Sequence, residues 1–292
     1  MGERTPTCAL NEQLRFEDLK PFMAQRPLIL ITNDDGIHSR GLQAAVTACA
    51  PFGELLVVAP ARQQTAAGRS KPHTSTGRIE QVVFEVPPGT PGGTIVGLGV
   101  DGSPAQAVEH GIFEFATRPV DLTVSGINFG ENLGESITTS GTFSAALEAA
   151  SYAVPAIAAS RQTDPIHYLD HTANLDFSTA AHFLSRLVEI VLAKGMPQGV
   201  DVIKLDVPEC ATPATPWRWT RLSRQRYYFP VKPTRPSYDH AVPMGFAIRA
   251  DPTIVEPDSD IRAVAIDGVV SLCPLSSDMT ARTGQAELAA WG

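Results

Sequence analysis

Two adjacent acidic residues at the end of an apolar run are the strongest chemical signal in this sequence. Residues 28–31 (LILI) are apolar, and residues 32–36 (TNDDG) follow directly. Four apolar residues in a row are typical of a strand buried on both faces, so Asp34 and Asp35 are expected at its carboxyl end, where open α/β sheets bind ligands. Two fixed carboxylates repel each other. A bound divalent cation such as Mg²⁺ or Mn²⁺ relieves that repulsion, because such ions prefer oxygen ligands.

The same segment has a second interpretation. Asn-Asp-Asp-Gly is also an ordinary turn sequence, because Asn and Asp side chains bond to nearby backbone and Gly adopts positive φ angles. Short motifs have limited specificity. From this segment alone, a metal site and a simple turn therefore both remain open.

Polar loops follow two further expected strands. Residues 55–59 (LLVVA) predict a strand that ends before a polar loop over 61–71, and residues 120–124 (VDLTV) predict another that leads into 125–128 (SGIN). In a parallel sheet these loops meet at the same edge as Asp34 and Asp35. Together they offer oxygen ligands for a hard cation and neutral donors for an anion.

An anion site is expected at residues 140–142 (SGT), which directly precede a predicted helix over 142–152. The free backbone N–H groups at a helix N-terminus, together with the helix dipole, attract phosphate. Plain N-capping by Ser140 or Thr142 is the alternative, because helices generally prefer such a cap.

The elements that position these residues predict a doubly wound α/β fold. Apolar residues recur at helical spacing over 42–49, between the strands expected at 28–31 and 55–59. A strand, a helix and a strand with short connections form a βαβ unit, which crosses over right-handed into a parallel sheet. Further expected elements are strands at 79–85, 94–98, 155–159, 202–205 and 269–272, and helices at 105–115, 180–194 and 283–291.

Residues 211–257 differ from the rest of the chain. They are rich in proline and show little helical periodicity, which predicts hairpins or an extended arm. Their apolar area exceeds what a solvated loop exposes, so we expect burial against a second subunit and a homodimer or larger; packing on its own subunit is the alternative. Deletion of about 222–250 is expected to give a monomer with impaired activity. The large aromatic residues include Trp217, Trp219, Tyr227, Tyr228, Phe229 and Phe246, of which Tyr227, Tyr228 and Phe229 are candidates for stacking on a base or for packing within the arm.

Composition bounds the function. A chain of 292 residues can bury a large core, and a net charge of −8 without a basic run argues against a general nucleic-acid surface. Residues 1–26 lack the apolar stretch of a secretory signal and are expected to be an N-terminal extension with a short docking helix. No apolar run approaches the roughly 18 residues that cross a bilayer. We therefore expect a cytoplasmic protein whose four cysteines are reduced: Cys8, Cys49, Cys210 and Cys273.

Several of these motifs together resemble those of the SurE family (survival protein E, metal-dependent 5′-nucleotidases). The resemblance covers about residues 27–292 and is thin through the arm. Several motifs in the family's order and spacing are far more specific than any one of them. They are 31–38 (ITNDDGIH), 57–60 (VVAP), 124–128 (VSGIN), 132–134 (NLG) and 140–142 (SGT), with weaker matches at 270–275 and 278–281.

The resemblance implies a fold and an activity. It implies a Rossmann-like α/β core with a C-terminal hairpin arm exchanged between subunits, in dimers or tetramers. It implies hydrolysis of nucleoside 5′-monophosphates with one divalent metal ion, Mg²⁺ or Mn²⁺, per subunit. The implied metal ligands are Asp34, Asp35, Asn128 and Thr65, either aspartate could also orient the attacking water, and the implied phosphate-binding residues are Ser140, Gly141, Thr142 and Asn132.

Four positions depart from the family's pattern. Thr65 stands where the family usually has a serine, and Ala61 and Gln106 stand where it has aspartates. Arg282 replaces a histidine found in some members. These changes leave the implied carboxylate ligands in place and bear on substrate preference and rate.

Two functions other than a phosphomonoesterase are also compatible with parts of the sequence. Gly97, Gly99 and Gly102 match G-x-G-x-x-G after a short apolar run, with Asp121 at a distance that suits a ribose-binding carboxylate, so a dinucleotide-binding oxidoreductase is one alternative. The helix is expected to begin only at Pro104, after the third glycine, which counts against it. The other alternative is a non-catalytic sensor of phosphate ligands, because a fold does not fix a function.

Overall fold

The computed structural model describes residues 26–88, 90, 93–170 and 174–291, so the expected N-terminal extension lies, apart from Arg26, outside the described residues. Eleven strands occur in this part of the chain. They are β1 (Leu28–Thr32), β2 (Glu54–Pro60), β3 (Ile79–Phe84), β4 (Ile95–Val100), β5 (Leu122–Phe129), β6 (Ala156–Arg161), β7 (Val202–Val207), β8 (Trp217–Trp219), β9 (Tyr228–Val231), β10 (Gly245–Ile248) and β11 (Val270–Leu275).

Nine of these strands form one mostly parallel sheet in the order β3-β4-β2-β1-β5-β6-β7-β11-β8. The six from β4 to β7 are parallel, β3 is antiparallel to β4, and β11 is antiparallel to β7. From β1 the chain proceeds through β2 to β4 on one side, and from β5 through β6 to β7 on the other. The order reverses between β1 and β5, which is the place where doubly wound sheets bind ligands.

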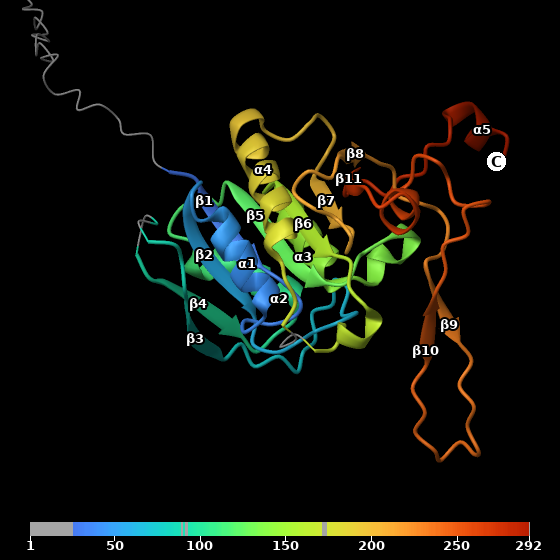
Figure 1. The fold of residues 1–292 in the computed structure, drawn as a ribbon, viewed down its shortest axis with the longest axis horizontal. Helices are drawn as coiled ribbons and strands as arrows, with labels where there is room; N and C mark the ends of the chain where they lie inside the picture. Colours follow the sequence, from blue (N-terminus) through green and yellow to red (C-terminus); the bar gives the residue numbers. More distant parts are fainter. Residues whose placement is uncertain (1–25, 89, 91–92, 171–173, 292) are drawn as a thin grey trace, which may run out of the picture.

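Helices cover both faces of the sheet (Figure 1). α1 and α4 pack together on one face, and α2 and α3 pack together on the other. The helices are α1 (Arg40–Cys49), α2 (Pro104–Glu109) with its continuation η2 (His110–Phe115), α3 (Gly141–Ser151), α4 (Ser178–Lys194) and α5 (Gln285–Ala289), with short turns at η3 (Gly134–Thr139), η4 (Pro165–His167) and η5 (Arg262–Ile266).

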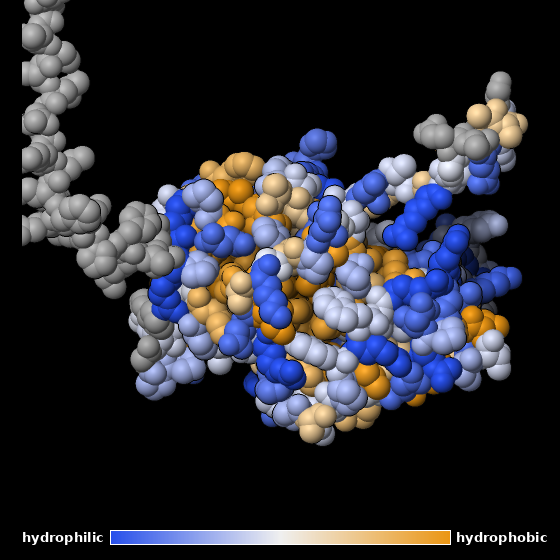
Figure 2. All heavy atoms as spheres, turned by 90° about the horizontal axis from the view of Figure 1, so that it is seen from above, coloured by the Kyte–Doolittle hydropathy of each residue, from blue (hydrophilic) through white to orange (hydrophobic). Residues whose placement is uncertain are grey.

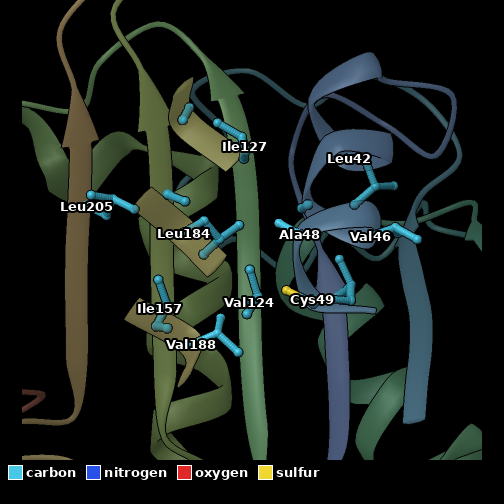
Figure 3. Packing of buried hydrophobic residues seen from close by; sticks show 14 of the residues in the cluster. Leu42, Val46, Ala48, Cys49, Val124, Ile127, Ile157, Leu184, Val188 and Leu205 are labelled. Atoms are coloured by element: carbon cyan, nitrogen blue, oxygen red, sulfur yellow. The ribbon is translucent and has the colours of Figure 1, made fainter. Parts of the chain in front are cut away.

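Strand β1 is apolar on both faces because each face meets a pair of helices. Ile29 and Ile31 belong to the core under α1 and α4, which Figure 3 shows, while Leu28 and Leu30 belong to the core on the α2 and α3 face. All four side chains are at most 4% exposed. The doubly wound α/β fold expected from the LILI run is thereby confirmed.

Two expectations about local structure were wrong. The SGIN segment at 125–128 continues β5 instead of forming a loop, because its backbone pairs with β6 as far as Phe129. Residues 217–219, assigned to the arm, form β8, which pairs in parallel with β11 at the edge of the main sheet. The arm proper is therefore shorter than 211–257.

Strands β9 and β10 form an antiparallel hairpin that projects from the body of the molecule (Figure 1). Tyr227, at its base, is 2% exposed and packs in a small core with Leu133 and Ile261. The expectation that this residue needs a second subunit for burial was wrong, because its own chain covers it. Figure 2 shows hydrophobic residues exposed in small groups between hydrophilic ones on the face seen there. Within the described ranges, no helix is both long and apolar enough to cross a membrane.

Candidate active site

Asp34 and Asp35 lie just beyond the carboxyl end of β1, and each is almost fully buried, with 4% and 2% exposed. The turn chemistry next to them belongs to Asn33, whose side chain donates to Gly36 O at 3.1 Å and accepts from Gly36 N at 3.2 Å. Gly36 has a φ of +97°, which suits glycine. Asn33 and Gly36 therefore make the turn that the second interpretation expected, and this turn presents the two carboxylates at the carboxyl end of β1.

Asp34 is held by the N-terminus of α3. The Thr142 hydroxyl donates to its Oδ1 at 2.6 Å, and the backbone N–H groups of Gly141 and Thr142 also donate to it. A Cβ on Gly141 would lie 2.6 Å from Asp34 Oδ2, so only glycine fits there. Burial raises the pKa of Asp34 from 3.8 to about 6, while these hydrogen bonds act in the opposite direction.

Asp35 is held from the two neighbouring strand ends. The Phe129 N–H at the end of β5 donates to Oδ2 at 3.1 Å, and Gln63 Nε2 in the loop after β2 donates to Oδ1 at 3.3 Å. Burial first, and the adjacent Asp34 charge second, raise the pKa of Asp35 well above its ordinary value. Two buried carboxylates with raised pKa values gain most from a nearby cation.

Thr65 and Asn128 line the same cavity as Asp34. The Thr65 loop is tied to the motif by a hydrogen bond from Gln64 N to Asp34 O of 2.7 Å. The amide nitrogen of Asn128 donates to Gly130 O at 2.7 Å, which fixes its oxygen as the atom free to bind a ligand. Two carboxylates, an amide oxygen and a hydroxyl are an oxygen donor set suited to Mg²⁺ or Mn²⁺.

A site of this kind contains few acidic groups. No cluster of three or more His, Cys, Asp or Glu side chains suited to a metal occurs in the part of the chain that the structure describes. The proposed ligand set of Asp34, Asp35, Thr65 and Asn128 contains only two carboxylates, so it does not count as such a cluster. The residues present therefore fit one hard cation with neutral oxygen ligands completing the carboxylate pair.

The four expected phosphate-binding residues divide into two pairs. Ser140 and Asn132 line the cavity, whereas Gly141 and Thr142 direct their donors at Asp34. The Ser140 hydroxyl also accepts from Phe143 N at 3.1 Å and so caps α3. Of the two residues considered as N-caps, Ser140 is therefore the one that caps α3.

The cavity has a volume of about 250 Å³ and an aromatic wall. Tyr168, Tyr228 and Phe246 form this wall: the Tyr168 and Phe246 rings are 9° from parallel with centroids 6.1 Å apart, and Tyr228 meets both edge-on. Of the three aromatic candidates at 227–229, only Tyr228 lines the cavity. Tyr227 is buried behind it, and Phe229 lies 5.0 Å from the Arg249 guanidinium.

Sequence reasoning missed Tyr168 and Glu131 as cavity residues. Tyr168 follows the short turn η4, far from any motif, and only the β6 register brings it to the cavity. Glu131 stands within the polar loop after Asn128, where an acidic residue is unremarkable. The one sequence feature that indicated a role for Glu131 was its position between Asn128 and Asn132, both expected site residues.

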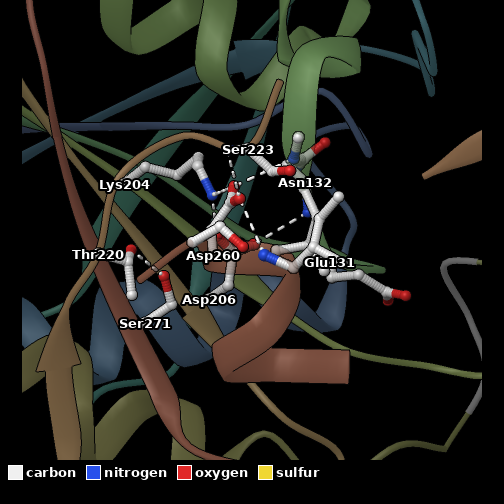
Figure 4. A network of polar contacts seen from close by, with 12 residues as sticks. Glu131, Asn132, Lys204, Asp206, Thr220, Ser223, Asp260 and Ser271 are labelled. Carbon is white, nitrogen blue, oxygen red and sulfur yellow. Dashed lines mark hydrogen bonds and ion pairs between the residues drawn. The ribbon is translucent and has the colours of Figure 1, made fainter. Parts of the chain in front are cut away.

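The loop that carries Asn132 is anchored by a buried ion network (Figure 4). Lys204 Nζ pairs with Asp206 and lies 3.1 Å from Asp260 Oδ2, and all three side chains are fully buried. Asp206 accepts from Asn132 N at 2.9 Å, and Asp260 accepts from Gly134 N at 3.0 Å. Burial opposes the Lys204 charge, but the two carboxylates overcome this effect and raise its pKa.

The loop that carries Thr65 is anchored in a similar way from α3. Glu148 is fully buried; Arg69 pairs with one of its oxygens and Lys71 Nζ lies 2.8 Å from the other. Lys71 also pairs with Glu109 of α2 at 2.8 Å. Arg69 and Lys71 thus fix the loop after β2 to α3 and α2.

The glycines at 97, 99 and 102 do not form a dinucleotide-binding turn. Gly97 and Gly99 lie inside β4, where a Cβ would come within 2.4 Å of the Phe84 ring and 2.7 Å of Glu80 respectively. Asp121 accepts a hydrogen bond from Leu28 N at 2.7 Å. The oxidoreductase alternative was wrong, because these residues are used for strand packing.

Comparisons with known proteins agree on one family. The sequence model of "Survival protein SurE" matches residues 29–229. The 5′-nucleotidase SurE of Thermococcus kodakarensis is 42% identical over 260 residues, covering 89% of this chain and 96% of that protein, and the one from Archaeoglobus fulgidus is 40% identical over 258 residues, covering 87% and 92%. The crystal structure of the SurE protein from Aquifex aeolicus superposes with a TM-score of 0.70 at 28% identity, covering 91% of this chain and 99% of that one.

Proposed function

The chain belongs to the survival protein SurE family, and from that premise we propose that it is a divalent-metal-dependent phosphomonoesterase acting on nucleoside 5′-monophosphates. Relatives named 5′-nucleotidase SurE match it at about 40% identity over most of both chains. Neither the oxidoreductase nor the sensor alternative has an observation in its favour.

One observation carries the proposal: of two adjacent, buried carboxylates, Asp34 lines a cavity that also has an aromatic wall. Asp34 and Asp35 lie where the strand order of the sheet reverses, and Tyr168, Tyr228 and Phe246 line the same cavity as Asp34. A phosphate ester with an aromatic base needs a charged end and an apolar surface within one cavity. The site supplies both.

We propose that Asp34, Asp35, Thr65 and Asn128 hold one divalent cation per subunit, Mg²⁺ or Mn²⁺. When bound, such an ion supplies Lewis acidity to the phosphoryl group and makes water a better nucleophile. The chain's own contribution is positional. The N-terminus of α3 fixes Asp34, and Gln63 and the Phe129 N–H fix Asp35, so that either carboxylate can orient the attacking water.

We further propose that Ser140 and Asn132 contact the phosphate directly and that Gly141 and Thr142 act with them by orienting Asp34. Backbone and side-chain donors at a helix N-terminus stabilise charge that develops on phosphoryl oxygens. The Asn132 amide is already oriented by a hydrogen bond from its Nδ2 to Ser160 Oγ of 2.8 Å, which leaves its oxygen and second N–H for the ligand.

The base is proposed to stack against Tyr168, Tyr228 or Phe246, since aromatic stacking tolerates every base. The chain is also proposed to work in the cytoplasm as a homodimer or homotetramer. Support for assembly comes from the hairpin, where Val231, Met244 and Phe246 are 45%, 64% and 48% exposed.

The test is a substrate panel assayed for phosphate release with Mg²⁺ or Mn²⁺. The panel contains nucleoside 5′-monophosphates, sugar phosphates and short polyphosphates. Preferential hydrolysis of the nucleotides is expected. Equal hydrolysis of every ester would identify a general phosphatase instead, and no turnover with any metal would support a non-catalytic sensor.

A further inference from the structure

Glu131 is a buried carboxylate that the proposed reaction does not use. It lines the cavity, is 3% exposed and precedes Asn132 in the chain. In Figure 4 its side chain points away from Lys204, Asp206 and Asp260, so it does not belong to that ion network. A carboxylate next to a phosphate site is costly unless it has another role, because it repels the substrate.

Three tyrosine hydroxyls converge on this residue. Tyr227 donates to Oε1 at 2.6 Å, Tyr168 donates to Oε2 at 3.3 Å, and Tyr228 donates to the backbone oxygen of Glu131 at 2.7 Å. The Thr163 N–H also donates to Oε2 at 3.4 Å. These donors come from the segment after β6 and from the base of the hairpin, so Glu131 joins two parts of the chain that are distant in sequence.

The same tyrosines fix the aromatic wall. The Tyr168 and Tyr228 hydroxyls lie 3.3 Å apart, and both rings contact Phe246. Gly130 has no side chain where a Cβ would lie 2.7 Å from the Tyr168 ring, which allows that ring to lie against the backbone beside Glu131. Burial and the Glu131 charge raise the pKa values of all three tyrosines, so the hydroxyls remain protonated donors.

We infer that Glu131 is a positioning residue that holds the tyrosines of the aromatic wall and so determines the preference for phosphate esters that carry a nucleobase. Its carboxylate acts on Tyr168 and Tyr227, its backbone oxygen accepts from Tyr228, and it has no part in the bond-breaking step. The inference rests on the proposed function for its substrate class. Its physical basis is separate: the carboxylate accepts from Tyr227 on Oε1 and from Tyr168 on Oε2, so its loss frees the Tyr168 ring of the wall and the Tyr227 ring that packs against Tyr228.

The experiment compares AMP with ribose 5-phosphate, which has the same sugar and phosphate but no base. In Glu131→Gln an amide NH₂ replaces one carboxylate oxygen, so it faces the Tyr227 or the Tyr168 hydroxyl and cannot accept its hydrogen bond. We expect kcat/KM for AMP to fall about tenfold, mostly through KM, with ribose 5-phosphate changed less than about twofold. Glu135→Gln is the matched control, because Glu135 pairs at the surface with Arg226 of the same hairpin base.

Calorimetric binding of adenosine without metal gives a second readout that needs no catalysis. Weaker adenosine binding by Glu131→Gln, with wild-type binding by Glu135→Gln, is expected. Equal losses on AMP and ribose 5-phosphate, or unchanged selectivity and adenosine affinity, would overturn the inference. If Glu131→Gln fails to fold by circular dichroism, Tyr227→Phe decides, since it removes one hydroxyl from Glu131 behind the wall. A wild-type protein that binds adenosine but releases no phosphate from AMP refutes the proposed function and leaves the binding comparison to judge Glu131.

Discussion

Asp34 and Asp35 occupy positions where ionisation is unfavourable. Both are nearly inaccessible to water, and burial is the first cause of the raised pKa of each. The unfolded chain ionises these groups freely, so their charges lower the free energy of unfolding at neutral pH. A cation that binds only the folded protein restores that stability by mass action.

A first prediction concerns Asp34→Asn in metal-free protein. Its folded pKa of about 6 exceeds the ordinary 3.8, so the folded state binds more protons than the unfolded state between these values and stability falls as pH rises from about 4 to about 6. The substitution removes this loss. Thermal unfolding in EDTA at pH 8 should show a Tm a few degrees higher than wild type, at about 2–4 °C per kcal/mol. At pH below about 4 the gain should vanish.

Asp278→Asn is the control for that measurement. Asp278 is exposed, and hydrogen bonds from Thr280 lower its pKa, so its neutralisation should not stabilise the protein. A Tm gain at pH 8 that is equal in the two variants, or one that persists below pH 4, would contradict the account of Asp34.

Gly141 leads to a second prediction, which is steric. In Gly141→Ala the new Cβ would lie 2.6 Å from Asp34, so the carboxylate must move. We expect kcat/KM to fall about tenfold or more and a higher Mn²⁺ concentration to be needed for half-maximal activity. Gly284→Ala is the control, because nothing lies within 4 Å of a Cβ there. Wild-type metal dependence in Gly141→Ala would show that Asp34 is not held by this contact.

Between elements, the buried Lys204 network joins β7, the loop after β5 and the chain before and after the hairpin. Asp260 accepts from Gly134 N and, at 2.9 Å, from Ser223 N. A cation is needed because the two carboxylates of Asp206 and Asp260 would otherwise face each other in the interior. The arrangement of the loop after β5, strand β7 and the base of the hairpin therefore depends on the Lys204 ammonium.

Lys204→Met tests this dependence. Removing one member of a buried ion pair leaves an uncompensated charge, so we expect the free energy of unfolding to fall by about 3–5 kcal/mol in urea titrations. Lys194→Met, at the exposed end of α4, should change it by less than about 0.5 kcal/mol. A small loss in Lys204→Met would mean that water or a neighbouring group replaces the ammonium.

How far the sequence predicts these elements depends on whether their signal is local. The LILI run, the helical spacing over 42–49 and the helix start expected at Pro104 predicted β1, α1 and α2, and the structure places them there. The strand expected at 120–124 ended too early, because the following Ser, Gly and Asn residues are typical of a loop. Pairing with β6 extends β5 to Phe129. Tertiary pairing overrides local propensity in such cases.

In the candidate site, too, features with a local sequence signal were predictable and features made by tertiary contacts were not. The loops that follow the expected strands at 28–31, 55–59 and 120–124 were expected to meet, and hydrogen bonds from Gln63 and Gln64 to the Asp34–Asp35 pair and from Gly68 N to Thr139 O join them. The aromatic wall could not be predicted in the same way. Tyr168 and Phe246 are brought together by the sheet and the hairpin and have no shared sequence pattern.

On the scale of the whole molecule, the hairpin projects from the body and leaves apolar side chains exposed in a single chain. Tyr227 anchors its base in the chain's own core, so the broad deletion of 222–250 would also remove core packing. A sharper variant replaces Val231 and Met244, two exposed apolar side chains of the hairpin that do not line the cavity, with serine and keeps both strands. We expect the wild-type protein to sediment as a dimer or tetramer and this variant as a monomer with reduced activity. A monomeric wild type at micromolar concentration would contradict the assembly proposal.

If the Asp34–Asp35 pair holds a metal ion for hydrolysis of a nucleoside 5′-monophosphate, phosphate release from AMP must depend on both the metal and the carboxylates. We expect release by wild type with Mn²⁺, none in EDTA, and a loss on the order of 10²-fold or more in Asp35→Asn at saturating Mn²⁺. Full activity of Asp35→Asn at saturating Mn²⁺, or undiminished release in EDTA, would contradict it.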